Sequence, residues 1–108
     1  MALFKAIVIL AIATGYAPAA GGVNCNADCG VTAFGFQPGP AVAACGSAYA
    51  PGDVLHVDGY GVVVCADRFG AQVSPTQVDL WFATSEQAIE WGRRQVLVNK
   101  FAHFDIWR

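Results

Sequence analysis

Charged residues are scarce in this chain: six Lys and Arg and eight Asp and Glu among 108 residues, or 13%, with a net charge of −2. This mildly acidic chain has no basic patch that could neutralise phosphates. Nucleic acid is therefore not expected as a partner. Internal repeats and low-complexity segments are absent as well, and the length allows one domain at most.

Clusters of metal ligands and cofactor motifs are also missing. Zinc sites usually show a Cys-x-x-Cys pair or a tight Cys/His cluster. Here Cys25 and Cys29 are separated by three residues, and His56 and His103 lie at no helpful spacing. The sequence therefore predicts neither a metal site nor a cofactor.

Hydrophobic residues make up 56% of the chain, and part of this excess lies at the start. Lys5 precedes an apolar run over residues 6–14, and small residues follow at 17–20. This order is typical of a secretory signal peptide over residues 1–20, and the run is short for a membrane span. The alternatives are a buried N-terminal strand or helix and an uncleaved anchor, and only the anchor would imply a membrane.

Four cysteines would remain after such cleavage: Cys25, Cys29, Cys45 and Cys65. An even number in a small exported domain predicts two disulfides, and four cysteines allow three pairings between which the sequence does not choose. We favour Cys25–Cys29 with Cys45–Cys65, because Cys45 and Cys65 each end or interrupt a strand-like run. Export to the cell exterior or the cell envelope is therefore expected.

Short β-type runs separated by turns fill most of the chain. Pro and Gly mark turns at 37–40 and 51–53, and Asp58-Gly59 is a hairpin signal. Such short, closely spaced strands predict a mainly β fold, a small closed barrel or sandwich. The expected strands are residues 31–34, 41–45, 54–57, 60–66, 77–82 and 95–98.

One short helix is expected after the fifth of these strands. Thr84 can cap it, Gln87 stands at the capping-box position, and Gly92 marks its end. Arg93 and Arg94 are interpreted as partners of the helix dipole.

Two acids lie within apolar β-type runs: Asp67 ends one run, and Asp79 stands inside the next, twelve residues later. A carboxylate in such a place is costly unless it is paired, hydrogen-bonded or used in chemistry. Polysaccharide cleavage is one common use of such groups. By contrast, Asp53 and Asp58 are interpreted as ordinary turn residues, and His103 as part of a tail.

Two blocks of the chain, residues 42–61 and 66–96, resemble the three-aspartate domain of bacterial cell-wall enzymes. The first follows the family's approach strand, turn and Gly-Tyr-Gly hairpin, and the second its Ala-Asp, Ile-Asp-Leu-Phe and helix signature. Residues 31–34 match its opening Thr-Ala-Tyr strand. The resemblance implies a six-stranded double-psi β-barrel over residues 31–98, preceded by an arm at 21–30 and followed by a tail at 99–108.

The family also supplies the catalytic barrel of membrane-bound lytic transglycosylase A, so the resemblance implies an exported protein that acts on peptidoglycan glycan strands. Asp79 matches the aspartate that acts first as acid and then as base, which gives an anhydro product without water. Asp67 matches the aspartate that supports it. Tyr60, Phe69 and Trp81 are the expected substrate contacts.

The chain departs from the family where Cys45 and Ala83 stand in place of acids, so two acids of the signature remain. Three functions stay open. They are a lytic transglycosylase or glycoside hydrolase, a non-catalytic peptidoglycan-binding module, and a small secreted structural protein.

Overall fold

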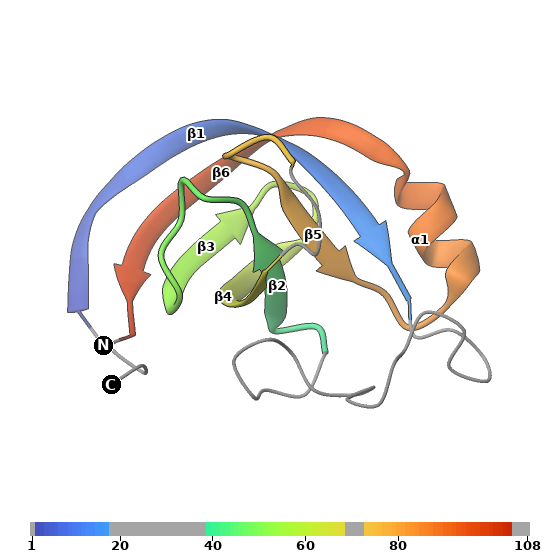
Figure 1. Ribbon diagram of the computed structural model, residues 1–108, viewed down its shortest axis with the longest axis horizontal. Coiled ribbons are helices and arrows are strands. Elements are labelled where there is room, and N and C mark those ends of the chain that lie inside the picture. Colours follow the sequence, from blue (N-terminus) through green and yellow to red (C-terminus); the bar gives the residue numbers. More distant parts are fainter. Residues whose placement is uncertain (1, 18–38, 69–72, 105–108) are drawn as a thin grey trace.

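Residues 2–17, 39–68 and 73–104 are described by the computed structural model, with side chains from Lys5 onward. They form a mainly β fold in which six strands close into a barrel with one short helix beside it (Figure 1). The elements are β1 Ala2–Tyr16, β2 Val42–Cys45, β3 Asp53–Val57, β4 Gly61–Arg68, β5 Val78–Trp81, α1 Ser85–Trp91 and β6 Arg93–His103.

Around the barrel the strands follow the order β1, β5, β2, β4, β3, β6. Two neighbouring pairs, β1 with β5 and β2 with β4, are parallel, and the others are antiparallel. The closed, mainly β architecture expected from the short strands is thus confirmed. Its interior is filled by the aliphatic side chains of alternating strand positions, of which Leu55, Val57, Val63, Leu80 and Val98 are almost completely buried.

The N-terminal apolar run is a barrel strand, and not a segment apart from the domain. β1 pairs with β6 from Ala2 to Thr14 and with β5 from Ala13 to Tyr16. Ala11 and Ala13 lie in the core at 2% and 0% exposure. The alternative of a buried N-terminal strand therefore describes the structure, and cleavage after Ala20 would remove this strand. No helix in the described ranges has the length and apolar character of a membrane span.

The barrel also continues beyond the boundary expected at residue 98. β6 runs to His103, where it still pairs with β1 and β3, so the tail predicted from residue 99 is wrong. Aromatic and polar residues at 99–103 hid the strand, because Lys100 and His103 are used in contacts that no local pattern reveals. The expected strand at 31–34 and the arm at 21–30 lie outside the described residues.

Helix α1 begins and ends at the residues that its sequence indicates. Thr84 Oγ1 accepts the Gln87 N–H at 3.2 Å, and Gly92 takes a positive φ of 68° that ends the helix. The buried Trp91 anchors α1 to the barrel, because its ring N–H donates to the Ala13 carbonyl at 3.3 Å. The ring also lies near Tyr60 and Phe82.

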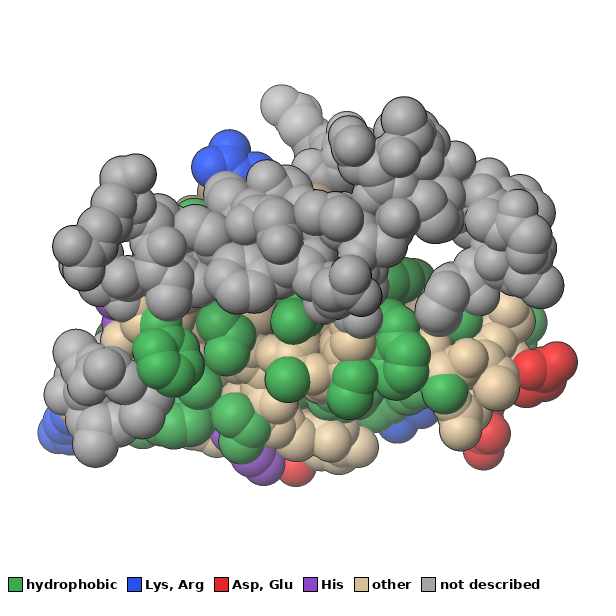
Figure 2. All heavy atoms as spheres, turned by 90° about the horizontal axis from the view of Figure 1, so that it is seen from below, with side chains coloured by type: hydrophobic (Ala, Val, Ile, Leu, Met, Phe, Trp, Pro, Cys, Tyr) green, Lys and Arg blue, Asp and Glu red, His purple; other side chains and the backbone are tan. Residues whose placement is uncertain are grey.

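Charged side chains are sparse on the described surface. On the face shown in Figure 2 apolar side chains gather in the centre and charged ones stand mostly at the margins. Apolar side chains also lie exposed on β1 and β6, where Val8, Leu10 and Leu97 are 61%, 58% and 48% accessible. Because charged side chains are sparse, the position of each Lys and Arg on this surface can indicate where an anionic group would bind.

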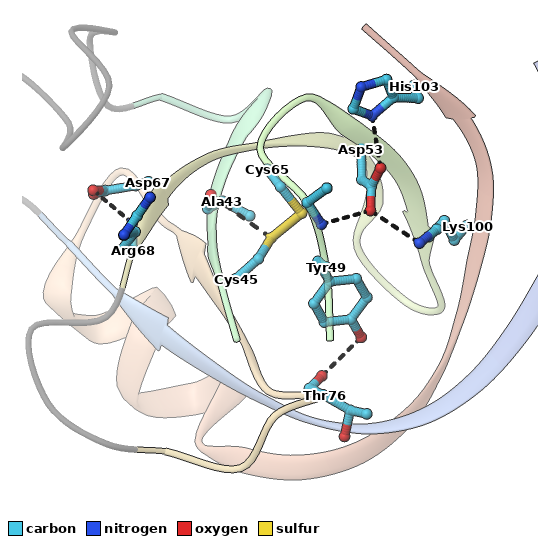
Figure 3. The surroundings of a disulfide bond; sticks show 11 residues. Ala43, Cys45, Tyr49, Asp53, Cys65, Asp67, Arg68, Thr76, Lys100 and His103 are labelled. Carbon is cyan, nitrogen blue, oxygen red and sulfur yellow. Dashed lines mark hydrogen bonds and ion pairs between the residues drawn. A yellow bond between two sulfur atoms is a disulfide. The ribbon is translucent and has the colours of Figure 1, made fainter. Parts of the chain in front are cut away.

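The Cys45–Cys65 disulfide joins β2 to β4 across the barrel wall, which confirms that part of the predicted pairing (Figure 3). The Cys25–Cys29 pair lies outside the described residues. Because the bond closes a loop over a sequence separation of 20 residues, it restricts the unfolded chain considerably.

We expect the Cys45→Ala/Cys65→Ala double variant to lose about 3 kcal/mol of unfolding free energy, since the unfolded chain regains the freedom of that loop. Urea unfolding followed by fluorescence measures the loss. Ser47→Ala, an exposed change within the same loop, serves as the control. Equal unfolding free energies for wild type and double variant would contradict the expectation.

A chain that begins at residue 21 should fail to form the barrel, because it lacks β1 and leaves β5 and β6 each with an unpaired edge. Amide NMR spectra of the two chains provide the measurement. Dispersed amide signals and cooperative unfolding of the shorter chain would show that β1 is dispensable.

Candidate functional site

Two strand pairings bring the two candidate acids into one row. Asp79 on β5 pairs with Ala44 on β2, and Ala44 pairs in turn with Asp67 on β4. On its other side, Asp79 pairs with Thr14 on β1. Because paired residues on neighbouring strands point to the same face of a sheet, Asp79 and Asp67 flank the small side chain of Ala44.

A β-bulge in β4 determines which residue reaches this row. Ala43 pairs with Cys65, but the next β2 residue, Ala44, pairs with Asp67, so Ala66 is an extra residue in β4. In a regular ladder, Ala66 would lie opposite Ala44. The bulge therefore turns the Asp67 side chain onto the face that carries Asp79, a common role of bulges beside functional sites.

That face is the outside of the barrel wall. Val78 and Leu80, on either side of Asp79, are fully buried in the core, whereas Asp79 itself is partly buried on the opposite face. On β4, Cys65 lies in the core, and the bulge at Ala66 breaks the alternation so that the partly buried Asp67 lies on the outer face. The two carboxyl groups are therefore on the outer side of the barrel wall, and not inside the barrel.

The Asp79 carboxyl has the properties expected of a general acid. Burial raises the pKa of its carboxyl, the hydrogen bond from Thr14 lowers it, and the negative charge of Asp67 raises it, with a net increase. Thr14 Oγ1 donates to Asp79 Oδ1 at 2.9 Å, and Gln77 Nε2 donates to Thr14 Oγ1 at 3.4 Å. A carboxyl that is oriented by a hydroxyl and holds its proton to a higher pH is suited to general acid catalysis.

Tyr16 belongs to the same site. Burial, followed by the negative charges of Asp79 and Asp67, raises the pKa of its hydroxyl to about 12. Tyr16 also pairs with Trp81, two residues beyond Asp79 on the same face of β5. The Tyr16 hydroxyl therefore remains protonated at neutral pH, as a hydrogen-bond donor near both acids.

The expected substrate contacts are placed differently from one another. Trp81 is partly buried on the outer face of β5. Tyr60 has its hydroxyl within hydrogen-bond distance of the Trp81 carbonyl, and its ring packs edge-on against Phe82. The Tyr60 ring thus supports the wall beside Trp81. Phe69 lies outside the described residues.

Thr14, Tyr16 and Gln77 were not among the residues expected in the site. The first two stand in the segment that resembles a signal peptide, and that interpretation removed them from the domain. The spacing of Thr14 and Tyr16, two polar side chains on one face of an apolar run, is the signal that could have indicated a half-exposed strand.

A second polar cluster ties β3 to β6 at the other side of the barrel (Figure 3). The Asp53 side chain, 4% exposed, contacts His103 Nδ1 at 2.8 Å, Lys100 Nζ at 3.1 Å and the Ala50 N–H at 2.8 Å. Burial raises the pKa of Asp53, but the hydrogen bonds from Ala50, His103 and Lys100 outweigh it and lower the pKa overall. Asp53 is therefore more than the ordinary turn residue that the sequence suggested.

No three His, Cys, Asp or Glu side chains converge on a possible metal site within the described ranges. Comparison with protein-family models finds no match to this chain, and comparison with curated proteins finds no significant relative. The candidate site consequently stands on its own geometry.

Asp53→Asn should destabilise the fold by about 2 kcal/mol at pH 7, since it leaves Lys100 and His103 without their carboxylate. Because the folded-state pKa of Asp53 is lowered, its contribution is complete above the unfolded-state pKa of about 4 and is lost as the pH falls through the folded value. Urea unfolding between pH 2 and 7 tests both points. Asp58→Asn, at an exposed turn position, is the matched control, and an equal loss in both variants would contradict the role of Asp53.

Proposed function

We propose that this chain is an exported peptidoglycan-active protein of the three-aspartate type, a lytic transglycosylase in which Asp79 is the acid and the base. The observation that supports the proposal is the placement of Asp79 beside Asp67 on one outer face, with the pKa of Asp79 raised. The parallel pairs β1/β5 and β2/β4 support a double-psi form of the barrel. The Cys45–Cys65 disulfide is compatible with an extracellular location.

In the proposed reaction, protonated Asp79 gives its proton to the glycosidic oxygen as the bond from that oxygen to C1 breaks. The resulting Asp79 carboxylate then takes the proton of the C6 hydroxyl of the same sugar, and the C6 oxygen bonds to C1. The product is a 1,6-anhydro sugar, and no water is consumed. Asp79 ends the cycle protonated, as it began.

The neighbours of Asp79 have separate parts in this scheme. Asp67 helps to keep Asp79 protonated before the reaction, and its negative charge favours the positive charge that develops at C1. Thr14 orients the Asp79 carboxyl through its 2.9 Å hydrogen bond. The Tyr16 hydroxyl is a donor for a sugar oxygen, and Trp81 offers an aromatic surface on the same face.

A non-catalytic peptidoglycan-binding module is the second candidate. Cys45 stands where the family often has an acid, and the disulfide occupies its side chain. Ala83 stands where a further acid is common. Two acids can suffice for binding without turnover. The reaction products, if any are formed from peptidoglycan, therefore distinguish the two functions.

Mass spectrometry of purified peptidoglycan after incubation with the full chain tests the proposal. Wild type should release anhydro-muropeptides, and Asp79→Asn should release them about a thousandfold more slowly, because the amide has no proton to give. Wild-type cleavage should also fall as the pH rises through the raised pKa of Asp79. Glu90→Gln, an exposed change on α1, is the control.

If wild type gives no new products but is retained by the glycan, the binding module is correct. If it neither cleaves nor binds the glycan, both proposals fail.

A further inference from the structure

Arg93 extends the row of the candidate site by one strand. It is the first residue of β6 and pairs with Thr14, the β1 residue that donates to Asp79. Along the row the residues are Arg93, Thr14, Asp79, Ala44 and Asp67, from five neighbouring strands. One end of the row therefore carries a guanidinium, and the two carboxyl groups lie further along it.

The burial pattern of β6 places Arg93 on the same outer face as the acids. Val96 and Val98 are in the core, whereas Gln95 and Leu97 are exposed on the other face. Arg93 lies two residues before Gln95, so it shares the exposed face with Gln95 and Leu97. Its partner Thr14 points the same way, because Thr14 reaches Asp79 there.

Arg93 and Arg94 follow the helix and were both interpreted from the sequence as partners of its dipole, but their environments differ. Arg94 Nε donates to the Trp91 carbonyl at 2.9 Å, Arg94 Nη2 donates to the Glu90 carbonyl at 3.3 Å, and the guanidinium lies 4.0 Å from the Trp91 ring centre. Arg94 thus serves the helix end. The Arg93 guanidinium makes no hydrogen bond or ion pair with the described part of the chain, and it is exposed.

We propose that Arg93 is a specificity residue that binds a carboxylate of the glycan substrate. This inference rests on the proposed function and adds the charge of the substrate to it. The planar guanidinium fork matches a carboxylate in a bidentate geometry. Two strand spacings put the backbones of Arg93 and Asp79 about 10 Å apart, so a sugar held at Asp79 brings its substituents within reach of the long Arg93 side chain.

Peptidoglycan offers such a carboxylate from two sources. One is the lactyl group of N-acetylmuramic acid, which is free where the peptide has been removed. The other is a carboxylate of the stem peptide. Both present the same chemistry to Arg93, while a neutral glycan presents none. The row would then favour anionic glycans although Asp67 alone would repel them.

Steady-state cleavage by the full chain tests the role of Arg93. Arg93→Gln should raise KM for carboxylate-bearing strands about tenfold with kcat nearly unchanged, since it removes a charge-assisted contact made before and during the reaction. Arg93→Lys should recover part of the loss. Lys5→Gln makes the same charge change at an exposed β1 position nine residues from Thr14 and should leave KM unchanged.

Three substrates separate the sources: intact strands, strands freed of peptide by an amidase, and peptide-free strands whose lactyl carboxyl groups have been converted to amides. A KM effect of Arg93→Gln confined to peptide-free strands identifies the lactyl carboxylate, and one confined to intact strands identifies the stem peptide. Equal KM values for wild type and Arg93→Gln on both carboxylate-bearing substrates would overturn the inference while leaving the proposed cleavage intact.

Calorimetric binding of a muramyl tetrasaccharide, as the free acid and as its amide, gives a readout that does not need turnover. Wild type should bind the acid more tightly, and Arg93→Gln should bind both equally. If no cleavage is detected but this difference holds, the proposed reaction fails and the role of Arg93 stands. If wild type does not distinguish the acid from the amide, the role of Arg93 is wrong.

Discussion

The pairing of β1 with both β5 and β6 is the interaction on which the rest of the structure depends. It closes the barrel, buries Ala11 and Ala13 in the core, and gives the ring of Trp91 its backbone acceptor. The same strand carries Thr14 to Asp79. One apolar segment therefore provides both the closure of the core and the hydroxyl that orients the candidate acid, which couples the integrity of the fold to the geometry of the site.

A second constraint acts on the opposite side of the row. The bulge at Ala66 brings Asp67 opposite Ala44, and the Cys45–Cys65 disulfide joins the same two strands at adjacent positions. A covalent bond beside a bulge limits how far β2 and β4 can slide past each other, and a slip of one residue would turn Asp67 to the other face. The Cys45–Cys65 disulfide thus helps to keep the two carboxyl groups at a fixed separation.

The acids of this barrel illustrate two outcomes of burying a carboxyl group. Asp53 receives donors from Ala50, Lys100 and His103, so its ionised form is favoured and it holds β3 to β6. From the described residues Asp79 receives one neutral hydroxyl, and it lies near another acid, so its protonated form is favoured. The first arrangement suits stability and the second suits proton transfer, because the number and charge of the donors decide which form is stabilised.

The sequence by itself determined the mainly β class and the cap and end of α1, because each depends on local patterns of apolar residues, turns and caps. It favoured the Cys45–Cys65 bond among three possible pairings, and the structure made the choice. The sequence also singled out Asp67 and Asp79. Only the tertiary structure decided that residues 2–16 are a barrel strand, since an apolar run with small residues suits a leader and a half-buried strand equally. The bulge in β4, the strand register and the different environments of Arg93 and Arg94 were likewise decided by strand pairing. Such pairing joins residues far apart in the chain and leaves no local signal.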